Sequence, residues 1–128
     1  VVGDGVRLHQ AIANLLANAR AHTPPGTHVR TSVARADGWA YVDVLDDGPG
    51  LEPGDLGRAF ERFYLWDRYG ADRPVGSGLG LAIVAELAAA MGGRVMVAST
   101  PGSGSAFTLE LEPVPVPART AYAPLTQP

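Results

Sequence analysis

The order in which helical and alternating patterns follow one another constrains the fold of this chain most strongly. A helical pattern runs from Asp4, its N-cap, to His22, where a Pro-Pro-Gly sequence stops it. A second helical pattern covers residues 79–91 and ends at a Gly-Gly pair. Each is followed by two β-rich alternating runs, at residues 28–36 and 39–46, and at 94–100 and 105–112. This order predicts an α/β two-layer sandwich, in which about three helices cover one face of a mixed, largely antiparallel sheet.

The segment between the first hairpin and the second long helix has a different character. It opens with the turn-dense "DDGPGLEPGD" of residues 46–55. The following "LGRAFERF", residues 56–63, predicts a short helix, and residues 64–78 show no firm period. A long irregular loop inside a compact domain usually has a function. We therefore expect this segment to contribute to a binding site.

Composition excludes several classes of protein and limits the number of domains. The 128 residues carry a net charge of −3 and no Cys, so a nucleic-acid-binding stripe and thiolate metal sites are not expected. No apolar run is long enough to span a bilayer. We expect one domain over residues 1–112, with residues 113–128 as a Pro-rich tail that is extended or disordered. The missing initiator Met suggests a piece of a longer protein.

The first helix places its only two asparagines on one stripe. Asn14 and Asn18 are the only Asn residues of the chain, and they lie four residues apart, between Gln10 and His22 on the same face. An amide oxygen is a suitable ligand for Mg²⁺, which commonly shares its shell with phosphates and water. Asn18 is the expected ligand, and Asn14 would reach a phosphate or a metal-bound water. The alternative is that both amides are simply solvated.

Two glycine-containing segments complete the set of candidate sites. Asp46, at a strand end, would accept a hydrogen bond from the amino group of adenine, while Gly48 and Gly50 leave room for the ring. The alternative there is an ordinary Asp-rich turn. In "VGSGLGLAIV", residues 75–84, alternate glycines would bring backbone N–H groups and a helix N-terminus to the phosphates. The alternative is a flexible hinge before a helix.

Other glycine-rich nucleotide motifs fit this sequence poorly. A dinucleotide fingerprint needs a strand directly before its glycines and a parallel crossover after them, whereas here a loop precedes and a hairpin follows. A Walker P-loop needs Lys, but Leu81 follows Gly80 and all ten of the Lys and Arg residues are Arg.

Four segments taken together resemble the boxes of a known family. "NLLANARAHT", "DDGPG", "FERFY" and "GSGLGLAIV" are similar, in this order, to the N, G1, F and G2 boxes of the ATP-binding catalytic domain of bacterial sensor histidine kinases. That superfamily also includes gyrase, the ninety-kilodalton heat-shock chaperone and a mismatch-repair ATPase. The resemblance covers residues 4–112 and implies the Bergerat fold, with ATP and Mg²⁺ as ligands.

The resemblance assigns roles to individual residues. It makes Asn18 the Mg²⁺ ligand, Asn14 its catalytic neighbour and Asp46 the carboxylate that recognises adenine. Phe60 and Phe63 match the F box of an ATP lid at about residues 53–78. The implied nucleotide-binding residues are Asn14, Asn18, His22, Asp46, Gly48, Gly50, Gly76, Gly78, Leu79 and Gly80.

The sequence also departs from the family pattern. Ala21 and His22 stand where a basic residue and an aromatic residue are frequent, and Leu65 follows "FERFY" where Arg is frequent. Arg20 could replace the missing positive charge, and His22 could flank the purine or simply end the helix. The lid arginines at 58, 62, 68 and 73 are candidates for phosphate contacts, with solvation as the alternative.

The resemblance further implies a kinase rather than a hydrolase. Related hydrolases place a Glu four residues before the metal Asn, and Asn14 cannot take a proton there. None of His9, His22 and His28 has the setting of the family's phosphoacceptor helix. We therefore expect an isolated catalytic domain that donates the γ-phosphoryl group of ATP to a histidine of a separate dimerisation and phosphoacceptor domain.

The resemblance also implies partners and a location for the parent protein. A cognate response regulator completes the signalling system, and neither nucleic acid nor direct membrane contact is expected for this domain. We expect a cytoplasmic domain whose parent protein is anchored in the bacterial cell membrane. The alternatives are a serine kinase acting on an anti-sigma antagonist, and a docking module without phosphotransfer.

Overall fold

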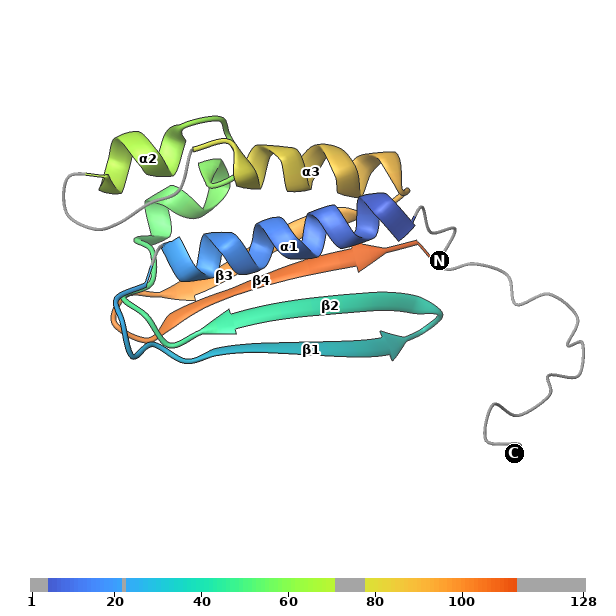
Figure 1. The fold of residues 1–128 in the computed structure, drawn as a ribbon, viewed down its shortest axis with the longest axis horizontal. Helices are drawn as coiled ribbons and strands as arrows, with labels where there is room; N and C mark the ends of the chain where they lie inside the picture. The colour runs from blue at the N-terminus through green and yellow to red at the C-terminus, as the bar shows by residue number, and fades with distance from the viewer. Residues whose placement is uncertain (1–4, 22, 71–77, 113–128) are drawn as a thin grey trace, which may run out of the picture.

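A computed structural model of the chain describes residues 5–21, 23–70 and 78–112. The helices form one layer and the sheet forms the other, as Figure 1 shows. The elements in chain order are α1 (Gly5–Ala21), β1 (Val29–Ala36), β2 (Trp39–Asp46), the 3₁₀ helix η1 (Pro53–Arg58), α2 (Tyr64–Tyr69), α3 (Gly80–Ala90), β3 (Arg94–Thr100) and β4 (Gly104–Leu111). The predicted N-cap Asp4 and the predicted tail, residues 113–128, lie outside the described residues.

The four described strands form one antiparallel sheet. Their order is β1-β2-β4-β3, so the two predicted hairpins lie side by side through the pairing of β2 with β4. Asp37 and Gly38 form the turn of the first hairpin with φ angles of 53° and 83°, as a type I′ turn requires. The predicted two-layer sandwich with its largely antiparallel sheet is confirmed.

The core lies between α1, α3 and one face of the sheet. The buried face of α1 consists of Ala11, Leu15 and Ala19, whose spacing matches the 3.6-residue period. They pack with Val44 and Leu109 of the central strands, and all five are fully buried. Edge strand β1 is mostly exposed, because the helices lie over the other strands.

The segment from residue 53 to residue 70 differs from the prediction. A short helix over 56–63 with an irregular segment from residue 64 was expected, but 3₁₀ helix η1 ends at Arg58 and α2 begins at Tyr64. Phe63 has a φ of 61°, which ends any helix at that point. Its N–H donates to the carbonyl of Gly78 at 2.7 Å. A contact with a distant residue therefore decides the break, which local pattern could not reveal.

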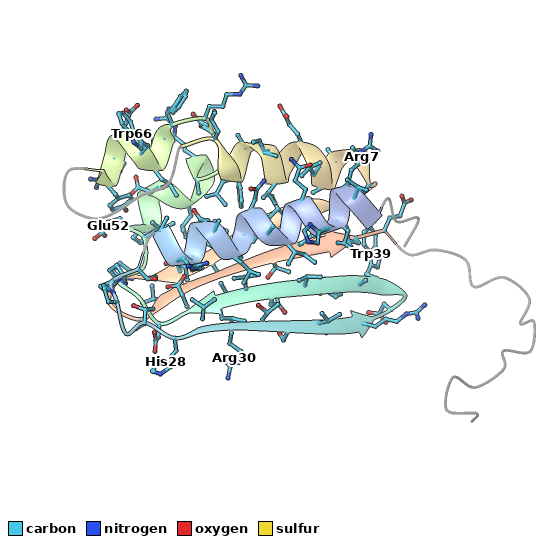
Figure 2. The ribbon with its side chains drawn as sticks, viewed as in Figure 1. Arg7, His28, Arg30, Trp39, Glu52 and Trp66 are labelled. Carbon is cyan, nitrogen blue, oxygen red and sulfur yellow. The ribbon has the colours of Figure 1, made fainter. Side chains whose placement is uncertain are left out.

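One end of the sandwich collects the loops of the predicted site. The C-terminal ends of α1 and β2, the turn between β3 and β4, and the segments η1 and α2 all meet there, at the left in Figure 1. Trp39 lies at the opposite end, where Figure 2 labels it. Among the described helices, none is long and apolar enough to cross a membrane.

Candidate functional site

A narrow pocket lies at the loop-rich end of the sandwich. Its walls come from α1, the end of β2 and the loop after it, β4 and α2. The lining residues are Asn18, Asp46, Pro49, Gly50, Leu51, Leu65, Ser105 and Phe107. The structure thus brings Asn18 of the first helix and Asp46 of the second strand to one cavity, together with Gly50. Its polar groups lie among apolar walls, which is the usual character of a small-molecule site.

Asp46 is oriented by its own loop. It is the last residue of β2, and its Oδ1 accepts the backbone N–H of Gly48 at 3.0 Å. A Cβ at Gly48 would lie 2.6 Å from Cγ2 of Thr23, so only glycine fits between the loop and the residues after α1. Thr23 is buried and donates from its hydroxyl to the carbonyl of Ala19 at 2.7 Å. The carboxylate is therefore held against the end of α1.

The turn between β3 and β4 holds the loop that follows Asp46 through hydrogen bonds. Ser99 Oγ accepts the N–H of Leu51 at 2.8 Å and donates to the carbonyl of Gly104 at 2.9 Å. Gly104 has a φ of 103°, and a Cβ there would clash with the carbonyl of Asp46. The N–H of Gly102 also donates to the carbonyl of Pro49 at 2.8 Å.

Sequence reasoning missed these supporting residues. No motif contains Ser99 or Gly104, because their role depends on β4 lying beside β2. The only available signal was the glycine in the turn of a predicted hairpin.

Asn14 carries an unsatisfied polar group. Its Nδ2 is buried and has no hydrogen-bond partner among the described residues. A buried donor without a partner costs about 1–3 kcal/mol, so such groups commonly have a functional reason. Asn14 lies one helical turn before Asn18, which lines the pocket. Arg20, on the last turn of α1, is exposed and does not line the pocket.

The donors at this site fit a magnesium ion that is shared with a phosphate. No group of three or more His, Cys, Asp or Glu residues gathers as a metal site in the part of the chain that the structure describes. Mg²⁺ bound to phosphates needs only one or two protein oxygens and keeps several waters. Asn18, whose side chain carries an amide oxygen, lines the pocket and could supply one such donor.

A buried carboxylate organises η1 and α2. Asp55 is 4% exposed, and it accepts hydrogen bonds from the hydroxyls of Tyr64, at 2.5 Å, and of Tyr69. Arg68 Nε lies 3.3 Å from Asp55 Oδ1, and Tyr69 also accepts the N–H of Glu52 at 3.0 Å. Burial alone would raise the pKa of Asp55, but the two hydroxyls and the arginine outweigh it and lower that pKa.

The described arginines of the predicted lid contact carboxylates. Arg58 donates to both carboxylate oxygens of Glu61 at 3.0 Å. Arg62 lies 3.5 Å from Glu86 of α3, and Arg68 pairs with Asp55. Their role as phosphate ligands stays a prediction, and Arg73 lies outside the described residues.

Of the second glycine segment, the described residues Gly78, Leu79 and Gly80 do not line the pocket, and Gly78 lies beside α2. A Cβ at Gly78 would meet Phe63 Cδ1 at 2.6 Å, and a Cβ at Gly80 would meet nothing within 4 Å. Leu79, whose exposed fraction is 36%, precedes α3. The predicted site residues His22 and Gly76 lie outside the described residues.

The two aromatic residues of the predicted F box have different environments. Phe60 packs edge to face on Phe107, with ring centroids 6.0 Å apart, and so belongs to the core beside the pocket. Phe63 is 45% exposed and contacts Trp66, with ring centroids 6.5 Å apart. Core packing therefore accounts for the first ring and not for the second.

Comparison with known proteins decides the family. The family of histidine kinase-, DNA gyrase B- and HSP90-like ATPases matches residues 3–115. The chain belongs to this ATPase family. The sensor-like histidine kinase SenX3 of Mycobacterium tuberculosis is 45% identical over 111 residues, which make up 87% of this chain and 27% of that protein. This ATPase-family chain thus spans about a quarter of the length of that curated relative.

Solved structures agree with the family assignment. The mycobacterial sensor histidine kinase MprB superposes with a TM-score of 0.70 at 32% identity, covering 89% of this chain and 78% of that one. Full-length ShkA in complex with AMPPNP superposes with a TM-score of 0.71 at 37% identity, covering 88% of this chain and 23% of that one. Both likenesses extend over most of this ATPase-family domain.

Proposed function

We propose that this domain binds Mg·ATP in the pocket between α1 and the end of β2, and donates the γ-phosphoryl group to a histidine of a separate domain. The observation that carries the proposal is that Asn18 and Asp46, which are far apart in the sequence, line one pocket. An amide oxygen suited to Mg²⁺ and a carboxylate suited to the adenine amino group are the two chemistries that an adenine nucleotide requires at its opposite ends.

Asp46 would recognise the base. Its Oδ1 already orders the loop through Gly48, which fixes the direction of the carboxylate before any ligand arrives. Leu51 and Phe107 supply apolar walls for the faces of a purine ring. Adenine offers an exocyclic amino donor to this carboxylate, whereas guanine carries a carbonyl acceptor at the same position, which would repel it. The site therefore favours ATP over GTP.

Asn14 and Asn18 would hold the phosphate end. The unpartnered Nδ2 of Asn14 is a donor that a phosphate oxygen or a metal-bound water would satisfy. Asn18 would hold Mg²⁺, which neutralises phosphate charge during transfer. The beginning of α3, with Gly78, Leu79 and Gly80, and the predicted residues His22 and Gly76 remain proposed phosphate or nucleotide contacts. Positioning and charge neutralisation then supply most of the catalysis.

Phosphotransfer to a histidine is favoured over hydrolysis. An amide such as Asn14 takes no proton at neutral pH, so this position does not activate water. The acceptor would lie in the dimerisation and phosphoacceptor domain of the same or a paired protein, since the matched relatives are much longer sensor kinases. A response regulator would receive the phosphoryl group afterwards. Anchoring of the parent protein in the cell membrane belongs to the same proposal, as does the assignment of the domain to residues 1–112.

Calorimetric titration with Mg·ATP tests the site. We expect Asn18→Ala and Asp46→Ala each to remove most of the binding. Gln10→Ala, on the same stripe of α1, and Asp47→Ala, the exposed neighbour of Asp46, serve as matched controls and should bind as the wild type does. Unchanged affinity in both site variants would reject the assignment.

Phosphotransfer needs a second experiment. The domain is mixed with the helical region of its parent protein and with γ-labelled ATP, and the stability of the transferred label is measured. Label that is lost in acid and kept in base indicates phosphohistidine. Label that survives acid would indicate a serine kinase, and Mg·ATP binding without transfer would indicate a docking module.

A further inference from the structure

Leu65 of α2 is buried and forms one wall of the pocket in this structure. The cavity that remains between Leu65 and the other lining residues is only about 10 Å³, which is room for about one water molecule. A purine ring is far larger. Building on the proposed function, we propose that Leu65 competes with the nucleotide base for the pocket, so that ATP binds only when α2 moves outward.

The other walls of the pocket are poorly suited to move. Asp46 is fixed from both sides, by the N–H of Gly48 and by the close approach of Gly104. Leu51 is held by the hydroxyl of Ser99, and Phe107 lies in the middle of strand β4. Widening the pocket at any of these places would break the sheet or its core.

Helix α2 is joined to the rest of the molecule more weakly. Of its six residues only Leu65 and Tyr69 are buried, and Trp66 is 51% exposed at the outer surface. Figure 2 shows Trp66 at the top of the molecule, away from the sheet. Withdrawing Leu65 therefore moves one short element and takes Leu65 and Tyr69 out of the buried cluster, while α1, α3 and the sheet stay packed on one another.

Asp55 determines how firmly α2 is held. Its carboxylate accepts the hydroxyls of Tyr64 and Tyr69, which lie on either side of Leu65 in the sequence. When α2 leaves, each of these hydrogen bonds is replaced by a bond to water, so the net cost of leaving is much smaller than the strength of the bonds. Together, these residues form a latch that closes the pocket reversibly; its members are Asp55, Tyr64, Leu65 and Tyr69.

The latch lowers the apparent affinity for nucleotide. When only a fraction of the molecules is open, the apparent dissociation constant exceeds the intrinsic one by the inverse of that fraction. Leu65→Ala removes the competing side chain and weakens the closed state. We expect the Kd for Mg·ATP to fall by about tenfold in this variant. Asp55→Asn leaves the pocket lining intact and weakens only the latch, so its Kd should fall by a smaller factor of about three.

Calorimetric titration of the full chain with Mg·ATP measures both effects. Leu56→Ala is the matched control, because Leu56 is a half-buried leucine of η1 that does not line the pocket. Its Kd should equal that of the wild type. A Kd for Leu65→Ala that is equal to or higher than the wild-type value would overturn the proposal, because Leu65 would then be a wall that supports the base. Asp55→Asn decides the question in the same way if Leu65→Ala does not fold.

Fluorescence of Trp66 reports the movement directly. The chain has two tryptophans, and Trp39→Phe leaves Trp66 on α2 as the only one. We expect saturating Mg·ATP to change the Trp66 emission in this background, and to change it less when Leu65→Ala is added. Constant emission while calorimetry shows binding would overturn the proposal.

The outcomes separate this proposal from the function on which it rests. If the wild type and every variant fail to bind Mg·ATP, both the function and the role of Leu65 are rejected. If the wild type binds, Asn18→Ala does not, and Leu65→Ala shows no gain in affinity, the function stands and the role of Leu65 alone is rejected.

Discussion

The two sides of the pocket are held in place by different forces. On one side, α1 rests on the sheet through Ala11, Leu15 and Ala19, which are fully buried against Val44 and Leu109. On the other side, the latch is closed through the hydroxyl groups of Tyr64 and Tyr69, which both donate to the buried carboxylate of Asp55. The first side is therefore a fixed wall and the second an adjustable wall.

The difference shows how one small domain combines precision with movement. Apolar burial is lost only when a large area returns to water, so the fixed wall keeps the residues of α1 and β2 in position. The hydrogen bonds of the latch are replaced by bonds to water when α2 leaves, at a small net cost for each, so the adjustable wall opens while α1, α3 and the sheet stay packed. Asn18 and Asp46, which are proposed to hold the metal and the base, lie on the fixed wall, and Leu65, which is proposed to exclude the nucleotide, lies on the adjustable one.

Truncation in the fixed wall should produce the largest effect. Leu15 is fully buried, and Leu15→Ala leaves a cavity between α1 and the sheet. We expect the free energy of unfolding to fall by about 3 kcal/mol, as measured by urea denaturation. Val6→Ala on the same helix is the control, because Val6 is 76% exposed and should leave the stability nearly unchanged. A loss well below about 2 kcal/mol would mean that the fixed wall is not held by its core.

Removal of the latch carboxylate should produce a smaller and more local effect. Asp55→Ala leaves two tyrosine hydroxyls and Arg68 without their shared partner. We expect a loss of about 2 kcal/mol of stability, with hydrogen exchange accelerated in α2 and unchanged in α1. Asp67→Ala, an exposed acid of the same helix, is the control. Equal acceleration in both helices would erase the distinction between the two walls.

The latch should also make the adjustable wall sensitive to acid. Burial opposes ionisation of Asp55, but the hydroxyls of Tyr64 and Tyr69 and the charge of Arg68 outweigh it, so the pKa lies below the usual 3.8. Because the folded-state pKa is the lower one, this stabilisation is complete above pH 3.8 and disappears as the pH falls through the folded-state pKa. Urea denaturation at a series of acid pH values should show stability falling more steeply in the wild type than in Asp55→Asn. Parallel curves would contradict the ionised latch.

The smallest effect is expected at the exposed edge of the fixed wall. Asp47 accepts the N–H of His28 at 2.7 Å and pairs with its ring at 3.1 Å, but the two side chains are 58% and 89% exposed. Figure 2 shows His28 on the outside of the molecule. Exposed ion pairs contribute little, so Asp47→Ala should not shift the urea midpoint measurably. A clear shift would show that this edge also helps to hold the loop of Asp46.

Local pattern accounts for most of the fold and for the main candidate residues. The periods of α1 and α3, the alternation of the strands and the turn at Asp37 and Gly38 are properties of neighbouring residues, and the structure agrees with them. The two asparagines on one helical stripe and the carboxylate at a strand end were likewise visible in the sequence. That Asn18 and Asp46 belong to one site was implied only by the family resemblance, and the structure places both in the wall of one pocket.

The conformation of the adjustable wall depends on contacts between residues that are far apart in the sequence. The helix predicted over 56–63 does not continue past η1, which ends at Arg58. Phe63 instead donates its N–H to the carbonyl of Gly78, and α2 follows with two tyrosines that reach Asp55. In the sequence, Leu65 stands out only because the family frequently has Arg at that position. Its place in the pocket wall depends on helix α2, which begins at Tyr64. The sequence by itself determined the helices, strands and turns that form between neighbouring residues. The tertiary structure decided the rest, because the latch joins residues that have no periodic relation to one another.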